Sequence, residues 1–509
     1  MSKLTGEKVI YQAKNDTEKS FEYTLPEYLP GVARIVKATV CPQECVFTNS
    51  EGKATIHMPL KISVIYISEY DGRIKSFSFK EELSLPLGED FNYEDEFTAV
   101  PTCRVSGVQC LPLSQRKIAV KAYLSASVLV YAAQETPMYI PDENSCVFTK
   151  SITLPVCRKK IIPDSYFENE AEINFADGKT IGEIINTDIT SASIYAKPGD
   201  GQIDFEAKAH IHILYETPDS DDDENDSTYA FLDADVTLSD TIHCDKATPQ
   251  DKVFTCIDIH SAEPSLSYDG YGENKSLSLT VKYLVSGFLF ECGEDDFVTD
   301  IFAENCFAEA EYSDIAVDSI VLPVSKKEHI TQLVHTPLGE ISKVAECKTK
   351  IQHVTIEETE GTITASARCR MEILGTNSSG ELYSVDTPVI LRIPVAEKSG
   401  ISSGVLPEIL LGISDCSAAV KDGGIEARFE VSANGVLVGR TTVSVVSALD
   451  TGSSTTAAKK SGEITIYYPN PEEKLWDIAK KYRVSPEELC RINTVEEKDF
   501  SKKHTVIIP

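Results

Sequence analysis

One sequence pattern recurs three times along the chain. In each copy a turn glycine is followed by an alternating or near-continuous apolar segment that ends fourteen residues later. The copies read EGKATIHMPLKISVIY to Tyr66, DGQIDFEAKAHIHILY to Tyr215 and EGTITASARCRMEILG to Gly375. Such alternation is typical of β-strands, so the pattern predicts the same strand in the same context three times. A repeat of this kind constrains the chain to build one β-rich unit three times over.

Other strand-like segments keep the same order around each glycine. A β-branched segment precedes it, a second strand-like segment follows a polar turn, and a long apolar strand closes the unit. The preceding segments are 35–40, 184–194 and 341–351, and the closing segments are 117–131, 276–290 and 425–439. We therefore predict a mainly β protein with three tandem β-rich repeat domains, at residues 1–135, 146–292 and 305–448.

The charge of the chain excludes two classes of partner. Lys and Arg number 48 against 80 Asp and Glu in 509 residues, a formal net charge of −32. Nucleic acid and anionic membrane surfaces both select basic surfaces, so neither is an expected partner. No window approaches the roughly 18 uninterrupted apolar residues of a membrane-spanning helix, and we expect no membrane insertion. The hydrophobic content of 42% is enough for several cores.

The cysteines and the first residues bear on the compartment. Only Cys41 with Cys45 and Cys103 with Cys110 lie close in sequence, and neither spacing is the C-x₂-C of zinc or redox sites. Most of the others, such as Cys256, lie in strand-like segments, where thiols usually act as small buried hydrophobes. The start of the chain lacks the apolar core of a signal peptide. These features predict a cytoplasmic, reduced protein.

Candidate catalytic and metal sites are weak. The sequence contains no H-E-x-x-H, G-x-S-x-G, phosphate-binding glycine loop or G-x-G-x-x-G. His210 and His212 share one strand face, but no third ligand is suggested, and we interpret them as ordinary strand histidines. The acidic run 218–227 lacks the glycine and the terminal glutamate of a calcium loop and is interpreted as a solvated hairpin tip. We therefore predict no enzyme activity, no metal and no cofactor.

The last part of the chain has a different character. Residues 449–463 are rich in Ser, Thr, Gly and Ala and are predicted to form a flexible linker. Residues 464–509 hold eight basic and eight acidic side chains, so the whole of the −32 belongs to residues 1–463. The ITIYY and TVIIP segments at its two ends are predicted strands.

Two helices are predicted between those strands. Leu475, Ile478, Ala479 and Tyr482 recur at i, i+3, i+4 and i+7 and mark one apolar helix face. Trp476 is the sole tryptophan, and we expect it to pack in the fold rather than to stack on a sugar.

The second helix has a clear start signal. Ser485 and Glu488 have capping-box spacing, and Pro486 occupies the first helical position, where its missing N–H costs nothing. The helix is expected to run through Leu489 and to stop near Asn493. The segment is therefore predicted to form a small β-α-α-β domain.

These residues resemble the LysM family. The segment LWDIAKKYRVSPEELCRIN follows its consensus L-W-x-I-A-x-x-Y-x-V-x-x-x-x-L-x-x-x-N, and the resemblance covers essentially all of 464–509. LysM domains commonly bind N-acetylglucosamine polymers such as peptidoglycan through two loops, which correspond here to 470–474 and 494–503. The resemblance places a ligand- or partner-binding groove at Asn470, Glu472, Glu473, Lys474, Asn493 and Thr494.

Two departures from the LysM pattern affect the expected ligand. The family usually has Gly-Asp-Thr before the L-W pair, whereas this sequence has Glu472, Glu473 and Lys474. Two carboxylates in place of a small glycine turn should hinder the close approach of a sugar. The usual Pro-Gly-Gln before the last strand is replaced by Ser-Lys-Lys at 501–503. A glycan and a protein therefore both stay open as the ligand of this groove.

The repeats resemble a second family. The segment FEYTLPEYLPGVARIVKATV, followed by EGKATIHMPLKISVIYISEYDGRIKSFSF, is similar to the SPOCS domain of spore-coat proteins. Three such domains before a terminal LysM domain resemble the architecture of spore-coat morphogenetic proteins. The resemblance implies a non-enzymatic scaffold in the mother-cell cytoplasm, at the forespore surface or spore coat. Its implied partners are the basement-layer ATPase of the coat, which the LysM domain would dock, and other coat proteins. The alternative is a protein that binds peptidoglycan through LysM.

Overall fold

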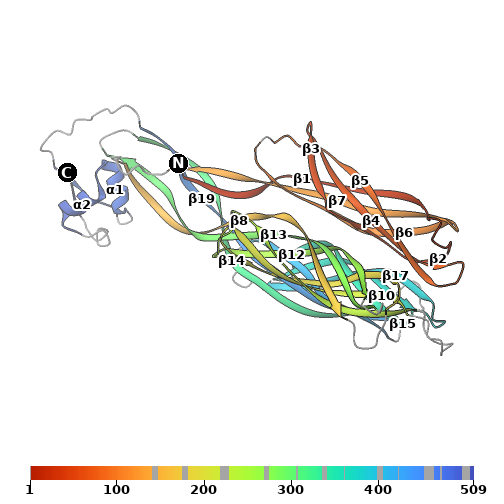
Figure 1. Cartoon of the computed structure of the whole chain (residues 1–509). Coiled ribbons are helices and arrows are strands. Elements are labelled where there is room, and N and C mark those ends of the chain that lie inside the picture. Colours follow the sequence, from red (N-terminus) through yellow and green to blue (C-terminus); the bar gives the residue numbers. More distant parts are fainter. Residues whose placement is uncertain are drawn as a thin grey trace.

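The computed structural model of the chain consists almost entirely of β-strands (Figure 1). Two short helices lie near the C-terminus and are followed by a strand, so the prediction of a mainly β protein with this helical segment is confirmed. The structure describes residues 2–93, 95–139, 147–174, 181–217, 229–268, 274–304, 308–334, 341–359, 361–397, 405–421, 424–451, 464–470, 473–495 and 505–509.

The first part of the chain forms two antiparallel sheets that share one core. One sheet has the order β1-β7-β6; in the other, β4 pairs with β2, β3 and β5. The side chains of β4 alternate between buried and less buried, as its sequence predicted, and its buried face closes the sandwich core. The strands are β1 (Ser2–Thr24), β2 (Val32–Pro42), β3 (Val46–Ser50), β4 (Lys53–Ser68), β5 (Ile74–Asp90), β6 (Thr98–Ser114) and β7 (Lys117–Met138).

The next two parts of the chain repeat this arrangement. The second sandwich pairs the sheets β8-β13-β12 and β9-β10-β11, and the third pairs β14-β19-β18 and β15-β16-β17. Each pair of sheets has its own core. The second sandwich contains β8 (Val147–Asn174), β9 (Ile184–Pro198), β10 (Gln202–Glu216), β11 (Tyr229–His243), β12 (Lys252–Tyr268) and β13 (Asn274–Ala303). The third contains β14 (Ala308–Val334), β15 (Lys343–Thr359), β16 (Thr362–Thr376), β17 (Leu382–Glu397), β18 (Val405–Lys421) and β19 (Gly424–Thr451).

The repeated glycine-led segments are the middle strands β4, β10 and β16 of one sheet in each sandwich. The glycines that precede them, Gly52, Gly201 and Gly361, have φ angles of 79°, 71° and 79°. A positive φ is strained for residues with a Cβ, so the turn before each middle strand requires glycine.

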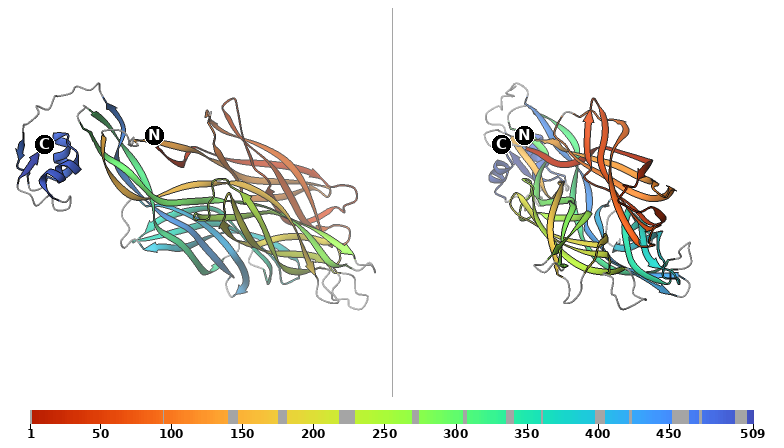
Figure 2. Two further views of the ribbon diagram at one scale, coloured as in Figure 1. Left: turned by 60° about the vertical axis from the view of Figure 1, so that its left-hand side comes forward. Right: turned by 45° about the vertical axis from the view of Figure 1, so that its right-hand side comes forward.

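The three sandwiches meet at equivalent positions. Ile65, Leu214 and Leu374 each lie thirteen residues after their turn glycine, and they pack together within one buried cluster. We call these three residues the apolar junction. A second cluster joins Tyr131 on β7 to Phe290 on β13 and Val438 on β19, the ends of the three closing segments. Contacts that unite the same position of all three units indicate an approximate three-fold arrangement, and Figure 2 shows the sandwiches side by side.

Four long strands project beyond the sandwiches. β13 continues through 293–303, between the second and third predicted domains, and pairs there with the start of β8. The start of β14 and the end of β19 form a second ribbon, and the two ribbons pack through Phe297, Val317 and Val445. We call these paired ribbons the stem. Figure 2 shows the stem reaching toward the helices, which lie at one end of an elongated molecule.

The C-terminal segment forms the predicted order of strand, helix, helix and strand, which we call the head. It contains β20 (Thr465–Tyr467), α1 (Leu475–Tyr482), α2 (Pro486–Asn493) and β21 (Val506–Ile508), and β20 pairs antiparallel with β21. Of the predicted linker 449–463, the first three residues belong to β19 and the others lie outside the described residues. The acidic run 218–227 also lies outside them.

Candidate functional site

The apolar residues predicted for the head form its core. Leu475, Ile478 and Leu489 are buried, and the ring of Tyr482 packs 5.3 Å from the ring of Tyr467, which precedes the first loop. At the start of α2, Ser485 Oγ accepts a hydrogen bond from the backbone N–H three residues on, at 3.3 Å. The helix face and the N-cap predicted from the sequence are therefore confirmed.

The first loop of the head is held by one carboxylate. Glu473 accepts hydrogen bonds from the Tyr467 hydroxyl, at 2.7 and 2.9 Å, and from the backbone N–H of Asn470, at 2.8 Å. The bond from the Asn470 N–H and the bond from the Tyr467 hydroxyl lower the pKa of Glu473. The carboxylate of Glu473, one of the predicted groove residues, is therefore used in hydrogen bonds that hold the loop.

The neighbouring groove residues have different environments. Lys474 is exposed and precedes α1, where Asp477 accepts its backbone N–H at 2.9 Å. Asn470 is exposed as well, whereas Glu472 lies outside the described residues. The side chains that the structure presents to solvent on this loop are thus Asn470 and Lys474.

Asn493 and Thr494 were both predicted for the groove, but the structure places them differently. The buried Asn493 amide donates to the carbonyls of Leu489 and Ile507, at 2.9 and 2.8 Å, and accepts from the Ile507 N–H at 2.7 Å. These bonds lock α2 to β21, a structural role that the sequence did not reveal. Thr494 ends α2 in the left-handed conformation, with a φ of 50°, and its side chain is exposed.

The helix α1 also contacts the tip of the stem. Trp476 Nε1 donates a hydrogen bond to Asp300 Oδ2 at 2.7 Å, and its ring lies 5.0 Å from that of Phe302, on the same strand, β13. Lys480 forms an ion pair with the same carboxylate, and the hydroxyl of Tyr312, on β14, donates to it at 3.0 Å. Trp476 packs in the fold, as predicted, but its partners come from a distant part of the chain.

The environment of Asp300 favours its charged form. Burial alone would raise the pKa of Asp300, but hydrogen bonds from Lys480, Trp476, the backbone N–H of Ile301 and Tyr312 outweigh it and lower the pKa. The carboxylate therefore stays ionised and can bind both head side chains near neutral pH. No local pattern around residue 300 predicted this role, because the contact joins residues 176 positions apart.

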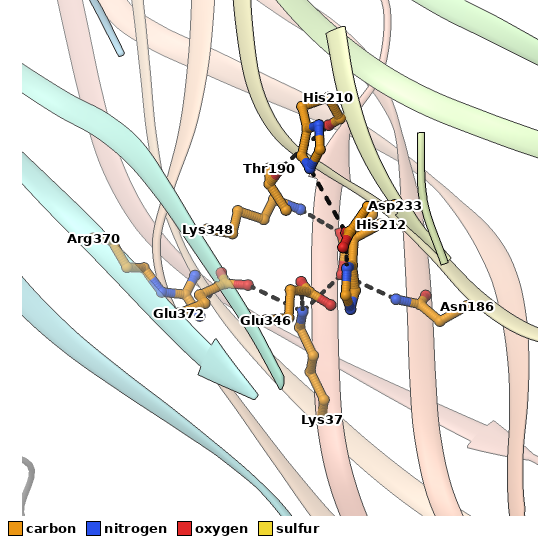
Figure 3. Close-up of polar contacts among 11 residues, drawn as sticks. Lys37, Asn186, Thr190, His210, His212, Asp233, Glu346, Lys348, Arg370 and Glu372 are labelled. Carbon is orange, nitrogen blue, oxygen red and sulfur yellow. Dashed lines mark hydrogen bonds and ion pairs between the residues drawn. The ribbon is translucent and has the colours of Figure 1, made fainter. Parts of the chain in front are cut away.

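A second polar site lies where the three sandwiches meet, and Figure 3 shows it. Lys37 on β2 approaches Asp188 on β9 at 2.7 Å, Glu346 on β15 at 3.3 Å and Glu372 on β16 at 3.7 Å. Lys348, also on β15, forms an ion pair with the other oxygen of Asp188. All five side chains are buried or nearly so, and we call them the charged junction.

Two residues of the charged junction, Lys37 and Glu346, occupy repeat-equivalent positions, and the second sandwich holds Asn186 there. Lys37, Asn186 and Glu346 pair with the three residues of the apolar junction, each next to a one-residue β-bulge in its own strand. Asn186 donates to the Asp188 carboxylate at 3.0 Å. The bulges turn polar side chains into the space between the sandwiches. Where the repeats touch, the apolar position is Ile or Leu in all three, whereas the residue paired with it is Lys, Asn or Glu.

The pKa values within the charged junction move in different directions. Burial opposes the charge of Lys37, but the carboxylates of Asp188, Glu346 and Glu372 outweigh it and raise its pKa well above the usual range. The pKa of Asp188 is held well below its usual value, because Lys348 and Lys37 overcome the effect of burial. At Glu372 burial is likewise outweighed, by Lys37, Lys348 and Arg370, and the pKa is lowered, whereas burial raises the pKa of Glu346. One oxygen of Glu346 and one of Glu372 are buried without a hydrogen-bond partner.

The two strand histidines lie beside this site, as Figure 3 shows. His210 Nδ1 contacts Asp235 at 2.7 Å and His212 Nδ1 contacts Asp233 at 2.6 Å, both across the β10–β11 pair. Within the described ranges, no group of three or more His, Cys, Asp or Glu side chains is placed to hold a metal ion.

Comparison of the chain with protein-family models, with curated proteins and with solved structures finds no match. Its resemblance to the LysM and SPOCS families therefore rests on the residues quoted above. In the part of the chain that the structure describes, none of the helices has the length and apolar character needed to span a membrane.

Proposed function

We propose that this chain is a non-enzymatic scaffold in spore envelope assembly. In this proposal three tandem SPOCS-like domains, at about residues 1–135, 146–292 and 305–448, form a rigid arm that binds coat proteins. The LysM-like head at 464–509 docks the arm to the forespore surface, in the mother-cell cytoplasm, with the basement-layer ATPase of the coat as its partner.

One observation carries this proposal: the arm and the head are built as separate parts. The three sandwiches share buried apolar and charged junctions, whereas the core of the head includes Phe302 of the stem tip and, among the described contacts, the head meets the arm only there. A rigid arm with a separate docking module suits a scaffold, because several weak sites in one chain raise the effective concentration of each.

The charge distribution supports basic partners for the arm. The formal charge of −32 belongs entirely to residues 1–463, and the head is neutral. Association with a basic coat protein should therefore weaken as salt rises, because exposed charges are screened over about 8 Å at physiological ionic strength. Docking through the neutral head should depend much less on salt.

The test is co-purification with the basement-layer ATPase from sporulating cells, using the tagged full chain. Ile478→Asp places a charge in the head core and should abolish co-purification. The control is Asp296→Asn in the stem, whose carboxylate accepts a hydrogen bond from Thr153; it should leave co-purification unchanged. If a chain without 464–509 still reaches the forespore and recruits coat proteins, the head is not the docking module and the proposal fails.

The alternative is peptidoglycan binding through the same head. It is favoured by the exposed Asn470, Lys474 and Thr494 side chains at the two loops that bind glycan in LysM domains. It is opposed by Glu473, whose carboxylate occupies the first loop. A pull-down with purified sacculi discriminates the two functions: retention at moderate salt that is lost in the Ile478→Asp variant supports glycan binding.

A further inference from the structure

Two cysteines face each other across the core of the third sandwich. Cys347 lies on β15 and Cys416 on β18, in opposite sheets, and their sulfur atoms are 3.1 Å apart. Both residues are buried, with 6% and 8% of their surface exposed. The hydroxyl of Thr349 lies 3.1 Å from the Cys416 sulfur as well. The pair therefore spans the two sheets at hydrogen-bonding distance.

The other two sandwiches show that packing does not require cysteine here. Cys347 pairs with Ile373, and the equivalent strand positions hold Ala38 in the first sandwich and Thr187 in the second.

Cys416 also has equivalents in the other sandwiches. It follows the bulge of β18, and Val108 and Ala262 hold the same place in β6 and β12. Small or branched side chains thus fill this position in two sandwiches, and a facing pair of thiols replaces them in the third.

The two thiols are chemically unequal. Hydrogen bonds from Cys347 and, more weakly, Thr349 outweigh burial and lower the pKa of Cys416, whereas the same bond and burial raise the pKa of Cys347. A thiolate is the nucleophile in cysteine oxidation, and an adjacent thiol can then resolve the oxidised sulfur. Cys416 fits the first role and Cys347 the second.

We propose that Cys347 and Cys416 are an oxidation site that forms a reversible disulfide between the two sheets of the third sandwich, with a peroxide as the oxidant. The Cys416 sulfur attacks one peroxide oxygen, the O–O bond breaks, and a sulfenic acid and one water form. The Cys347 sulfur then attacks the sulfenic sulfur, and the S–O bond breaks to release a second water. Two thiols and one hydrogen peroxide thus give one disulfide and two waters.

The disulfide would tie together strands 69 residues apart in sequence. Closing a loop of this length restricts the unfolded chain and stabilises the folded sandwich. We expect oxidation to raise the melting temperature of the third sandwich by roughly 5–10 °C, and reduction by an added dithiol, which is itself oxidised to a disulfide, to reverse the change.

The experiment treats the reduced full chain with hydrogen peroxide, alkylates the remaining thiols and identifies cross-linked peptides by mass spectrometry. The exposed thiol of Cys292 is the internal control for oxidant exposure. A peptide pair joining Cys347 to Cys416, about 2 Da lighter than the two reduced peptides, is the expected result. If Cys292 is fully oxidised and no such pair forms, the proposal is overturned.

A matched variant separates the disulfide from packing. Cys347→Ala with Cys416→Val copies the Ala38 and Val108 pair of the first sandwich. The variant should fold, give no cross-link and show no peroxide-dependent rise in melting temperature. An equal rise in the variant would assign the effect to another thiol and contradict the proposal, and the peptide map of the unmodified chain decides the matter even if the variant fails to fold.

Discussion

The charged junction and the contact between head and stem both join distant segments through ion pairs, but they are built differently. At the junction the side chains of Lys37 and Asp188 are only 5% and 10% exposed, and residues of all three sandwiches surround them. At the stem tip one carboxylate, Asp300, serves the head, and its partner Lys480 is 42% exposed.

This difference in burial predicts that the ion pairs of the junction stabilise the structure more than the ion pair between head and stem does. Removing one member of a buried ion pair leaves an uncompensated charge in a low dielectric, which is strongly destabilising. An exposed pair is screened by water and contributes little. The junction therefore fixes the sandwiches to one another, whereas the ion pair between head and stem contributes little beside the packing of Phe302 on Trp476.

The largest loss of unfolding free energy is expected from the replacement of Lys37. Lys37→Met keeps the length of the side chain but leaves Asp188, Glu346 and Glu372 with one lysine fewer, and it should cost about 3–5 kcal/mol of unfolding free energy. Denaturant unfolding of the full chain measures this loss. Lys14→Met, at an exposed lysine paired with Asp16, is the control and should change stability by less than about 0.5 kcal/mol. Equal losses of unfolding free energy in the two variants would show that burial does not make the ion pairs of the junction more important for stability.

The second-largest loss of stability is expected in the core of the head, and it tests whether the head unfolds independently of the arm. Ile478→Ala leaves a cavity in the head core and should destabilise the head by about 2–5 kcal/mol. Because Trp476 is the only tryptophan, its fluorescence reports on the head and on its contact with Asp300 and Phe302 at the stem tip. We expect its transition to move to lower denaturant, while the circular dichroism of the β-rich arm unfolds as before. A joint shift of both signals would show that head and arm unfold together.

The two glutamates of the junction should respond oppositely to pH. The folded pKa of Glu372 lies below its unfolded value, so its charge contributes stability above the unfolded pKa, about 4.3, and this is lost as pH falls through the folded pKa. Glu346 has a raised folded pKa, so its contribution is fully present below the unfolded pKa and is lost as pH rises through the folded pKa.

Substitution by glutamine tests these opposite signs. At pH 7 Glu372→Gln should destabilise the chain by about 1–3 kcal/mol, whereas Glu346→Gln should cost less, because burial raises the pKa of Glu346 and so reduces what its charge contributes. Denaturant midpoints measured across pH 4–7 check this order. A larger loss at Glu346 than at Glu372 would contradict it.

The smallest effect is expected at the head contact. Asp300→Asn removes the charge that pairs with Lys480 and weakens the bond to Trp476, and it should cost at most about 1 kcal/mol. The tryptophan emission should shift toward that of a more exposed ring, and small-angle scattering should show a more mobile head. Asp296→Asn, on the same strand, is the control. Unchanged emission in Asp300→Asn would show that ring packing on Phe302 alone holds the head.

Much of the fold could be predicted because its signals are local. Alternating apolar residues after Gly52, Gly201 and Gly361 predicted the strands β4, β10 and β16, and the spacing from Leu475 to Tyr482 predicted α1. The candidate site was harder to predict. The bonds of Asn493 to β21 were not predicted, because a consensus shows which residue recurs and does not show where its amide points.

The sequence by itself determined that this chain builds strands in a threefold repeat and ends in a small helical head. Periodicity shows which face of a strand is buried, and a cap residue shows where a helix begins. Only the tertiary structure decided that Lys37, Asp188 and Glu346 meet at the junction and that Asp300 holds Trp476. An isolated charge in a strand has the same local pattern whether it faces water or a neighbouring sheet, so its partner is fixed only when the sheets pack.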